Sequence, residues 1–239
     1  KSDYDTALDY YSRSLSIQEE LGDKNQMGAN LNNIGAVHAD KGDYDKALDY
    51  HSRSLAIREE IGDKRGMGQS LNNIGSLHSN KGDYDKALDY YSRSFTIREE
   101  IGDKRGMGYS LNNIGYLYAD KGDYNKAEDY LEKSLNIRKE IGVGADELLE
   151  ATSSLYLTYK HLVKHYDEKE IHTLIKEAEN IGYELNLRLY KLLEDKSYLE
   201  TAHNQLQEKA DAMDKELKEK FLKYPIPKQI IEEYNKVFN

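Results

Sequence analysis

Apolar residues recur along the chain with the spacing of helices that bury one face. Residues 63–80 follow the i, i+3, i+4, i+7 pattern of an amphipathic helix, with Leu71, Ile74, Gly75, Leu77 and His78 on the apolar side. Residues 84–101 show a second such stripe, made by Tyr84, Ala87, Tyr91, Ser94, Phe95 and Ile101. Between them, Lys81-Gly82-Asp83 offers a cation, a glycine suited to positive φ and an aspartate suited to cap the next helix. The pattern predicts a helix, a tight turn and a second helix, closing at Gly102.

This helix pair repeats. Residues 41–80 recur almost unchanged at 81–120, which gives a period of 40 residues. The glycines that end each pair mark the period and persist after the similarity decays, at Gly22, Gly62, Gly102, Gly142 and Gly182. We therefore expect an array over residues 1–142 with a truncated first repeat, degenerate repeat-like helices over 143–223, and a C-terminal segment over 224–239. Gly75 and Ala87 should be the points of closest approach within a pair, because small residues let helix backbones meet.

At these residues the chain resembles the tetratricopeptide repeat family, in a long variant of the repeat. The second repeat carries the family pattern at Ile74-Gly75, His78, Ala87, Tyr91 and Ser94. The third repeat carries it at Ile114-Gly115, Tyr118, Ala127, Leu131 and Ser134. Two departures are His38 and His78 in place of the usual tyrosine, and a Gly-Asp linker where the family often has proline. The resemblance implies an all-α, right-handed solenoid with C-terminal capping helices, whose first helices line a concave groove.

The resemblance also implies which residues face that groove. Helical steps of about 100° per residue place one face of each first helix away from the apolar stripe. Two asparagine columns follow that face, Asn32, Asn72 and Asn112 beside Asn33, Asn73 and Asn113. Around them lie Gln69, Ser76, Asn80, Tyr109, Tyr116, Asp40 and Asp120, which vary between repeats. Carboxamides donate and accept hydrogen bonds, so such a ladder suits the backbone of an extended peptide.

Other interpretations of these residues stay open. The asparagines can instead cap turns or bridge adjacent repeats, and Tyr109 and Tyr116 can be packing residues between repeats. The predicted groove positions carry no Lys or Arg. We therefore expect a protein or peptide ligand that is neutral or basic, rather than one held by its C-terminal carboxylate.

Sequence patterns typical of catalytic or metal sites are weak. Residues 62–68 lack the spacing of a phosphate loop, and Asp43-Tyr44-Asp45 continues as a helix where a calcium loop needs further ligands. His161 and His165 are one helical turn apart but have no metalloprotease pattern, which favours a solvated pair. Arg98-Glu99-Glu100 with Lys104-Arg105 suggests a solvated, ion-paired helix end, and we interpret His38, His51 and His78 as packing residues. We expect no enzyme activity, no metal and no cofactor.

Composition narrows the class of partner. The chain has 239 residues, of which 38% are apolar and 33% charged, enough for a core spread along a stack. A formal net charge of −10 argues against a broad nucleic-acid surface and against an anionic membrane. There is no cysteine, which is compatible with a reducing, cytoplasmic setting. The sequence begins inside a repeat, so we expect a longer parent protein.

The C-terminal quarter continues as a long amphipathic stretch from Tyr183 to Leu217, then a break at Pro225-Ile226-Pro227 and a short apolar segment. We expect this region to cap the array and the last segment to dock on its own chain, with a homodimer through these helices as the alternative. The leading functional hypothesis is a protein–protein interaction scaffold within a signalling or regulatory protein. The alternatives are a self-assembling structural module and a peptide-sensing regulatory domain of a multidomain bacterial protein.

Overall fold

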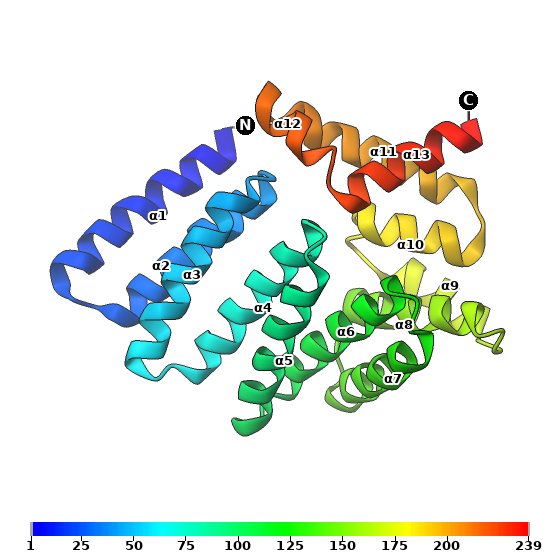
Figure 1. The fold of residues 1–239 in the computed structure, drawn as a ribbon, viewed down its shortest axis with the longest axis horizontal. Helices are drawn as coiled ribbons and strands as arrows, with labels where there is room; N and C mark the ends of the chain where they lie inside the picture. Colours follow the sequence, from blue (N-terminus) through cyan, green and yellow to red (C-terminus); the bar gives the residue numbers. More distant parts are fainter. Residues whose placement is uncertain (1, 239) are drawn as a thin grey trace. The chain divides into compact units, whose positions relative to one another are not determined.

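The computed structural model describes residues 2–238, and these residues form thirteen helices and no strand (Figure 1). The predicted all-α class is therefore confirmed. The chain divides into two compact units. Unit 1 comprises Lys1–Asp103 and Lys209–Tyr224, and unit 2 comprises Lys104–Glu208 and Pro225–Asn239. Both units are discontinuous in sequence, which the predicted division into residues 1–142, 143–223 and 224–239 did not anticipate.

Unit 1 is built from helix pairs. Its helices are α1 (Ser2–Leu21), α2 (Lys24–Asp40), α3 (Tyr44–Ile61), α4 (Lys64–Asn80), α5 (Tyr84–Glu100) and α12 (Lys215–Phe221). Consecutive helices pack on one another, and α2 also contacts α4, so the first helices of adjacent pairs lie side by side. Small apolar clusters join successive pairs, for example Leu55 with Leu71 and Ile74.

Unit 2 continues the same alternation. It contains α6 (Lys104–Asp120), α7 (Tyr124–Ile141), α8 (Ala145–His161), α9 (Glu168–Glu177), α10 (Tyr183–Leu193), α13 (Pro225–Phe238) and most of α11 (Lys196–Asp211). Helix α8 packs against α6, α7, α9 and α10. One apolar cluster runs through the unit and includes Leu131, Leu149, Ile171 and Leu189. Helices α6, α8 and α10 therefore form a row, as α2 and α4 do in unit 1.

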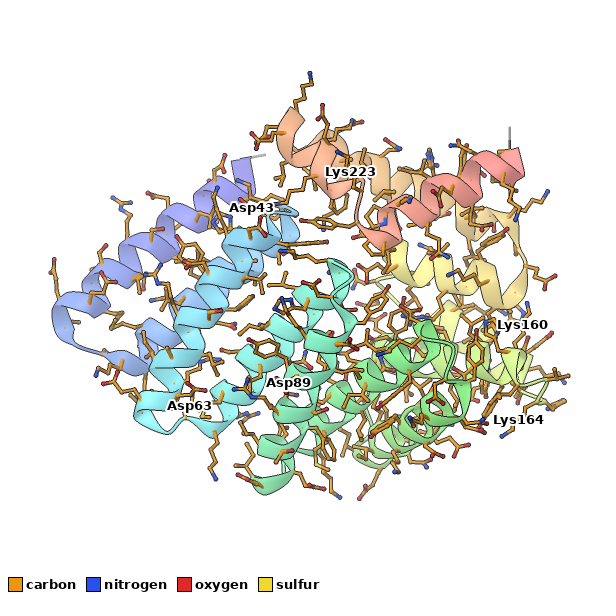
Figure 2. The ribbon with its side chains drawn as sticks, viewed as in Figure 1. Asp43, Asp63, Asp89, Lys160, Lys164 and Lys223 are labelled. Atoms are coloured by element: carbon orange, nitrogen blue, oxygen red, sulfur yellow. The ribbon has the colours of Figure 1, made fainter. Side chains whose placement is uncertain are left out.

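The Gly-Asp turns behave largely as the sequence predicts. Gly62 and Gly82 have φ of 72° and 84°, in the left-handed region that favours glycine. The Asp63 carboxylate, labelled in Figure 2, accepts a hydrogen bond from the Gly66 amide at 2.9 Å and caps α4. Asp83 is the exception, because its side chain makes no cap bond to α5. Its Oδ2 lies 3.3 Å from Nδ1 of His78 instead.

The predicted points of close approach are confirmed. A Cβ added at Gly75 would lie 2.8 Å from the Tyr91 ring, which is closer than real Cβ contacts. Ala87 is fully buried. The histidines predicted to pack also do so: the rings of His38 and His78 stack on Tyr50 and Tyr90, with centroids 5.4 and 5.5 Å apart.

The predicted solvated, ion-paired helix end is wrong for Arg98, which belongs to a column of buried arginines. The other four residues are exposed: Glu99, Glu100, Lys104 and Arg105. Arg98 is only 7% exposed and donates to the Gly68 carbonyl at 3.3 Å. Arg58 and Arg138 occupy the same place in their repeats and are also buried. Gly68 makes room for this packing, since a Cβ there would lie 3.0 Å from Cγ of Arg98. The glycine of the first helix thus leaves space that the arginine side chain of the second helix fills.

The C-terminal region differs from the expected single stretch. Three helices replace it, because Glu194 takes a left-handed conformation after α10 and Asp214 caps α12 through the Leu217 amide at 2.9 Å. The chain does break before Pro225, but the two prolines then occupy the first turn of α13. Helix α13 docks on its own chain, as expected: the Tyr234 ring stacks on His203 of α11, with centroids 3.8 Å apart.

Candidate functional site

The first asparagine column does not form an open ladder. Asn32 and Asn112 are 5% and 2% exposed, so their amides are enclosed by the protein. Asn32 Oδ1 accepts a hydrogen bond from Nδ2 of Asn73 at 3.0 Å and lies 3.2 Å from Nδ1 of His51. Asn112 Nδ2 donates to Glu150 Oε1 at 3.4 Å. These contacts match the alternative of bridges between repeats, and we exclude Asn32 and Asn112 from the ligand surface.

The other predicted residues are more accessible. In unit 1, Asp40 and Gln69 are exposed, and the remaining members are partly exposed: Asn33, Asn72, Asn73, Ser76 and Asn80. Gln69 also accepts a hydrogen bond from Arg58 at 3.5 Å. In unit 2, Asn113 is partly exposed, and the guanidinium carbon of Arg138 lies 4.8 Å from the centre of the Tyr109 ring. Tyr109 therefore has a packing role inside its unit, as the alternative proposed.

Unit 2 contains a pocket of about 200 Å³ at which two predicted residues meet, Tyr116 and Asp120 of α6. The row of helices α6, α8 and α10 lines most of it, with α7 and Ile226 of α13 at its edges. Leu131, Leu157, Leu187 and Ile226 give the pocket apolar walls. At this pocket, residues predicted from the sequence line a concave part of the surface.

Opposite charges face each other across this pocket. Asp120 accepts a hydrogen bond from the Tyr116 hydroxyl, whereas α10 contributes Arg188 and Lys191. Arg188 donates to the Glu150 carbonyl at 3.3 Å, and its guanidinium carbon lies 4.9 Å from the centre of the Tyr116 ring. Lys191 Nζ donates to Gln229 Oε1 at 3.0 Å. Both cations thus donate to protein acceptors, and the carboxylate of Asp120 accepts from the Tyr116 hydroxyl.

The surroundings shift two of these groups towards neutrality. Burial among protein atoms raises the pKa of Asp120, although Lys191 and Arg188 oppose that shift. Burial also lowers the pKa of Lys191, against the attraction of Asp120. The pocket is therefore lined by an acidic side chain, Asp120, and a basic one, Lys191. Such a lining favours a ligand with polar or charged groups over a purely apolar one.

The charge argument from sequence needs correction. The predicted groove positions of the repeats carry no cation, but α10 places Arg188 and Lys191 on the same row of helices. Their signal in the sequence is two cations three residues apart, on one face of an apolar stretch. It was missed because the similarity between repeats has decayed at α10, although Gly182 before this helix keeps the 40-residue spacing.

Two aromatic rings complete the pocket. His161 at the end of α8 stacks on Tyr124 of α7, with ring centroids 4.4 Å apart and planes within 10°. His161 and His165 are both exposed, as the prediction of solvated histidines requires, and His161 has this aromatic contact in addition. Among residues 2–238, no group of three or more His, Cys, Asp or Glu is arranged to hold a metal ion. No helix of the described part is long and apolar enough to cross a bilayer.

Comparisons with known proteins identify the repeat. A family model described as tetratricopeptide repeat matches residues 1–60 and 66–140, more than half of the chain. No curated protein sequence matches the chain.

Solved structures share the fold at low sequence identity. The apo form of RapI has a TM-score of 0.68 at 15% identity, covering 99% of this chain and 72% of RapI. BtubC (BKLC) from P. vanneervenii has a TM-score of 0.61 at 17% identity, covering 100% and 95% of the two chains. A Rap protein complexed with competence and sporulation factor has a TM-score of 0.65 at 17% identity, covering 98% and 72%. At these identities the likeness concerns the fold alone.

Proposed function

We propose, from the premise that this chain belongs to the tetratricopeptide repeat family, that it is a non-enzymatic scaffold that binds a peptide or partner segment along the α6, α8 and α10 row. The observation that carries the proposal is the pocket of about 200 Å³ lined by Tyr116, Asp120, Arg188 and Lys191. A pocket of that size admits a side chain of a longer segment, with apolar walls for its stem and charged groups for its end. The scaffold would act within a cytoplasmic signalling or regulatory protein.

The charges of the pocket favour a neutral or basic segment. Arg188 and Lys191 already donate to protein acceptors, whereas the Asp120 carboxylate accepts from the Tyr116 hydroxyl and keeps further acceptor capacity for a ligand. A lysine or arginine of the ligand would add a direct ion pair to Asp120, whose charged form burial disfavours although Lys191 and Arg188 favour it. Each hydrogen bond contributes about 0.5–1.5 kcal/mol net, so neighbouring contacts along the row are also needed for useful affinity.

The test begins with peptides selected from a random display library on the full chain. Selected peptides are labelled, and their affinities for variants are measured by fluorescence polarisation. Asp120→Asn should weaken binding of basic peptides about tenfold, the lower end of the range for one charged hydrogen bond, and Tyr116→Ala should weaken it as well. The matched control is Asp129→Asn, because Asp129 is exposed on α7 and lies outside the pocket. Peptides that bind all these variants equally would refute the assignment of the pocket.

A regulatory form of the same function is the second candidate. The fold resembles that of a Rap protein solved in complex with competence and sporulation factor, which supports a domain that responds to a bound factor. If so, a selected peptide should change amide hydrogen exchange in helices beyond α6, α8 and α10. Protection confined to the pocket would leave the chain as a passive scaffold. Light scattering over a concentration series separates both forms from the self-assembling alternative, which a stable monomer excludes.

A further inference from the structure

A segment far along the chain packs on the second helix pair of unit 1. Residues Lys209–Tyr224, here called the latch segment, belong to unit 1, although the residues on both sides of it belong to unit 2. The segment lies against the turn between α2 and α3. We call the corner the surface made by Gly42 of this turn and by Tyr44 and Asp45 at the start of α3. Figure 2 labels Asp43 in this turn and Lys223 in the latch segment.

Three aromatic rings form the centre of the contact. The Tyr44 ring stacks on Tyr224, with centroids 4.7 Å apart, and meets the edge of Phe221 at 6.5 Å. Phe221 and Tyr224 also contact each other edge-on, at 6.4 Å. Phe221 is fully buried, and Tyr44 and Tyr224 are 4% and 8% exposed. The first repeat has a tyrosine at the matching place, Tyr4, and that residue is 39% exposed.

Gly42 leaves the space into which the latch segment packs. Gly42 has φ of 77°, and a Cβ there would lie 2.6 Å from Cε of Met213 and 3.3 Å from the Phe221 ring. Gly122, two repeats later, has nearly the same φ of 79°, but a Cβ there would meet nothing within 4 Å. The two glycines share one backbone requirement and differ in their surroundings, so the close contact at Gly42 belongs to the latch segment.

Charge complements the aromatic contact. Lys220 forms an ion pair with Asp45, which also accepts a hydrogen bond from Lys81 Nζ at 2.8 Å. Hydrogen bonds from these two lysines lower the pKa of Asp45 to about 2. Both partners of the Lys220–Asp45 pair are about half exposed, so its contribution is modest and mainly fixes orientation.

The latch segment is held by the corner more than by its own structure. Helix α12 has only seven residues, too few to be stable alone. The hydroxyl oxygen of Tyr224 is buried without a hydrogen-bond partner among the described residues. Such a group is costly while enclosed and would be hydrated on release. These properties suit an occupant that can leave without unfolding the repeats.

We propose that the corner is a docking surface for a short helix and the turn that follows it, with a lysine followed by two aromatic residues three positions apart, occupied here in cis by Lys220, Phe221 and Tyr224. A partner protein whose helix has this pattern binds the corner when the latch segment leaves. The corner is in unit 1, and the pocket proposed to bind peptides is in unit 2. The two sites can therefore be tested separately.

The experiment uses a labelled synthetic peptide of residues 209–224 and the full chain with Phe221→Ala and Tyr224→Ala, which empties the corner. The peptide should bind this variant at least ~10-fold more tightly than it binds the wild type, because a tethered occupant competes at high effective concentration. Adding Gly42→Ala should abolish most of that binding, while adding Gly122→Ala should not. Absence of binding to the double variant, or equal effects of the two glycine substitutions, would overturn the proposal.

A milder variant guards against loss of folding. Lys220→Glu reverses one exposed charge and should leave the helicity seen by circular dichroism unchanged. It should nevertheless increase peptide binding over wild type by ~3-fold, the order expected from one exposed ion pair. Equal binding by this variant and the wild type counts against the proposed role of Asp45 and Lys220.

Discussion

One position of the second helix in each pair holds different residue types in successive repeats. His51, Tyr91 and Leu131 occupy the same place in successive repeats. Each side chain lies over a glycine of the preceding helix: a Cβ at Gly35 would lie 2.9 Å from His51, and one at Gly115 2.6 Å from Leu131. The missing side chain is therefore the constant element, and the residue above it can be polar, aromatic or aliphatic. Only His51 among the three carries a titratable group that changes charge near neutral pH.

His51 should make stability depend on pH. Burial, and then the charge of Arg58, lower its pKa from 6.5 to about 4. Between those values the unfolded chain binds a proton that the folded chain does not, so stability falls as pH falls. The loss should be about 2 kcal/mol from pH 7 to pH 5.

The matched variant is His51→Tyr, which installs the residue of the next repeat. Urea unfolding at pH 7 and pH 5, followed by circular dichroism, compares the two proteins. The stability change of the variant between the two pH values is subtracted from that of the wild type. This removes the contributions of the carboxylates, which both proteins share. A variant that loses as much stability as the wild type over this interval would show that His51 is not the titrating group.

Two kinds of basic side chain link helices in unit 1: exposed lysines and buried arginines. Lys24 pairs with Glu60 and Lys64 with Glu100, each bridging 36 residues along the exposed edge of unit 1. The arginines of the second helices are buried instead. Arg58 donates to the Gly66 carbonyl at 2.6 Å and to Ser70 Oγ at 3.1 Å. Buried cations with several acceptors should matter more to stability than exposed pairs with one.

Arg58→Ala should therefore destabilise the protein by about 2–4 kcal/mol, because it removes buried hydrogen bonds and the packing of the aliphatic stem. Lys64→Ala is the control: its ammonium lies 2.9 Å from Glu100, but the side chain is 55% exposed. That substitution should cost less than about 1 kcal/mol. Urea unfolding measures the free energy of unfolding of both variants. Similar losses of stability would show that the buried arginine contributes no more than the exposed lysine.

The sequence predicted these helices well because the period and the Gly-Asp turns act locally. The sequence analysis was wrong about side chains whose burial depends on a helix of another part of the repeat array. Helical steps place Asn32 beside the apolar stripe, but they do not distinguish the groove from the face that meets the next repeat. Arg98 looked solvated because its seat is made by Gly68, thirty residues away on another helix. Asp214, in contrast, was a readable capping signal for α12.

At the scale of the molecule, the site was predicted only in part. Tyr116 and Asp120 of the proposed pocket follow from the repeat pattern, whereas Arg188 and Lys191 come from a helix where the similarity between repeats has decayed. The latch segment could not be foreseen, since Lys220 pairs with Asp45 across 175 positions and no local pattern encodes that contact. The repeat array is nearest-neighbour in its packing, and this one long-range contact within unit 1 departs from that rule.

Closing that contact covalently should stabilise the protein and block the corner. The chain has no cysteine, so Asp45→Cys with Lys220→Cys gives one unique pair for a short bis-maleimide cross-linker. A cross-link over a loop of this length can stabilise by at most about 5 kcal/mol, through the entropy of the unfolded chain. The unfolding midpoint should rise, and the cross-linked protein should not bind the peptide of residues 209–224. Each single-cysteine variant, treated with the same reagent, controls for modification alone. A cross-linked chain that still binds the peptide at Gly42 would show that the latch segment and the peptide use different surfaces, because a covalently seated occupant leaves that corner no room.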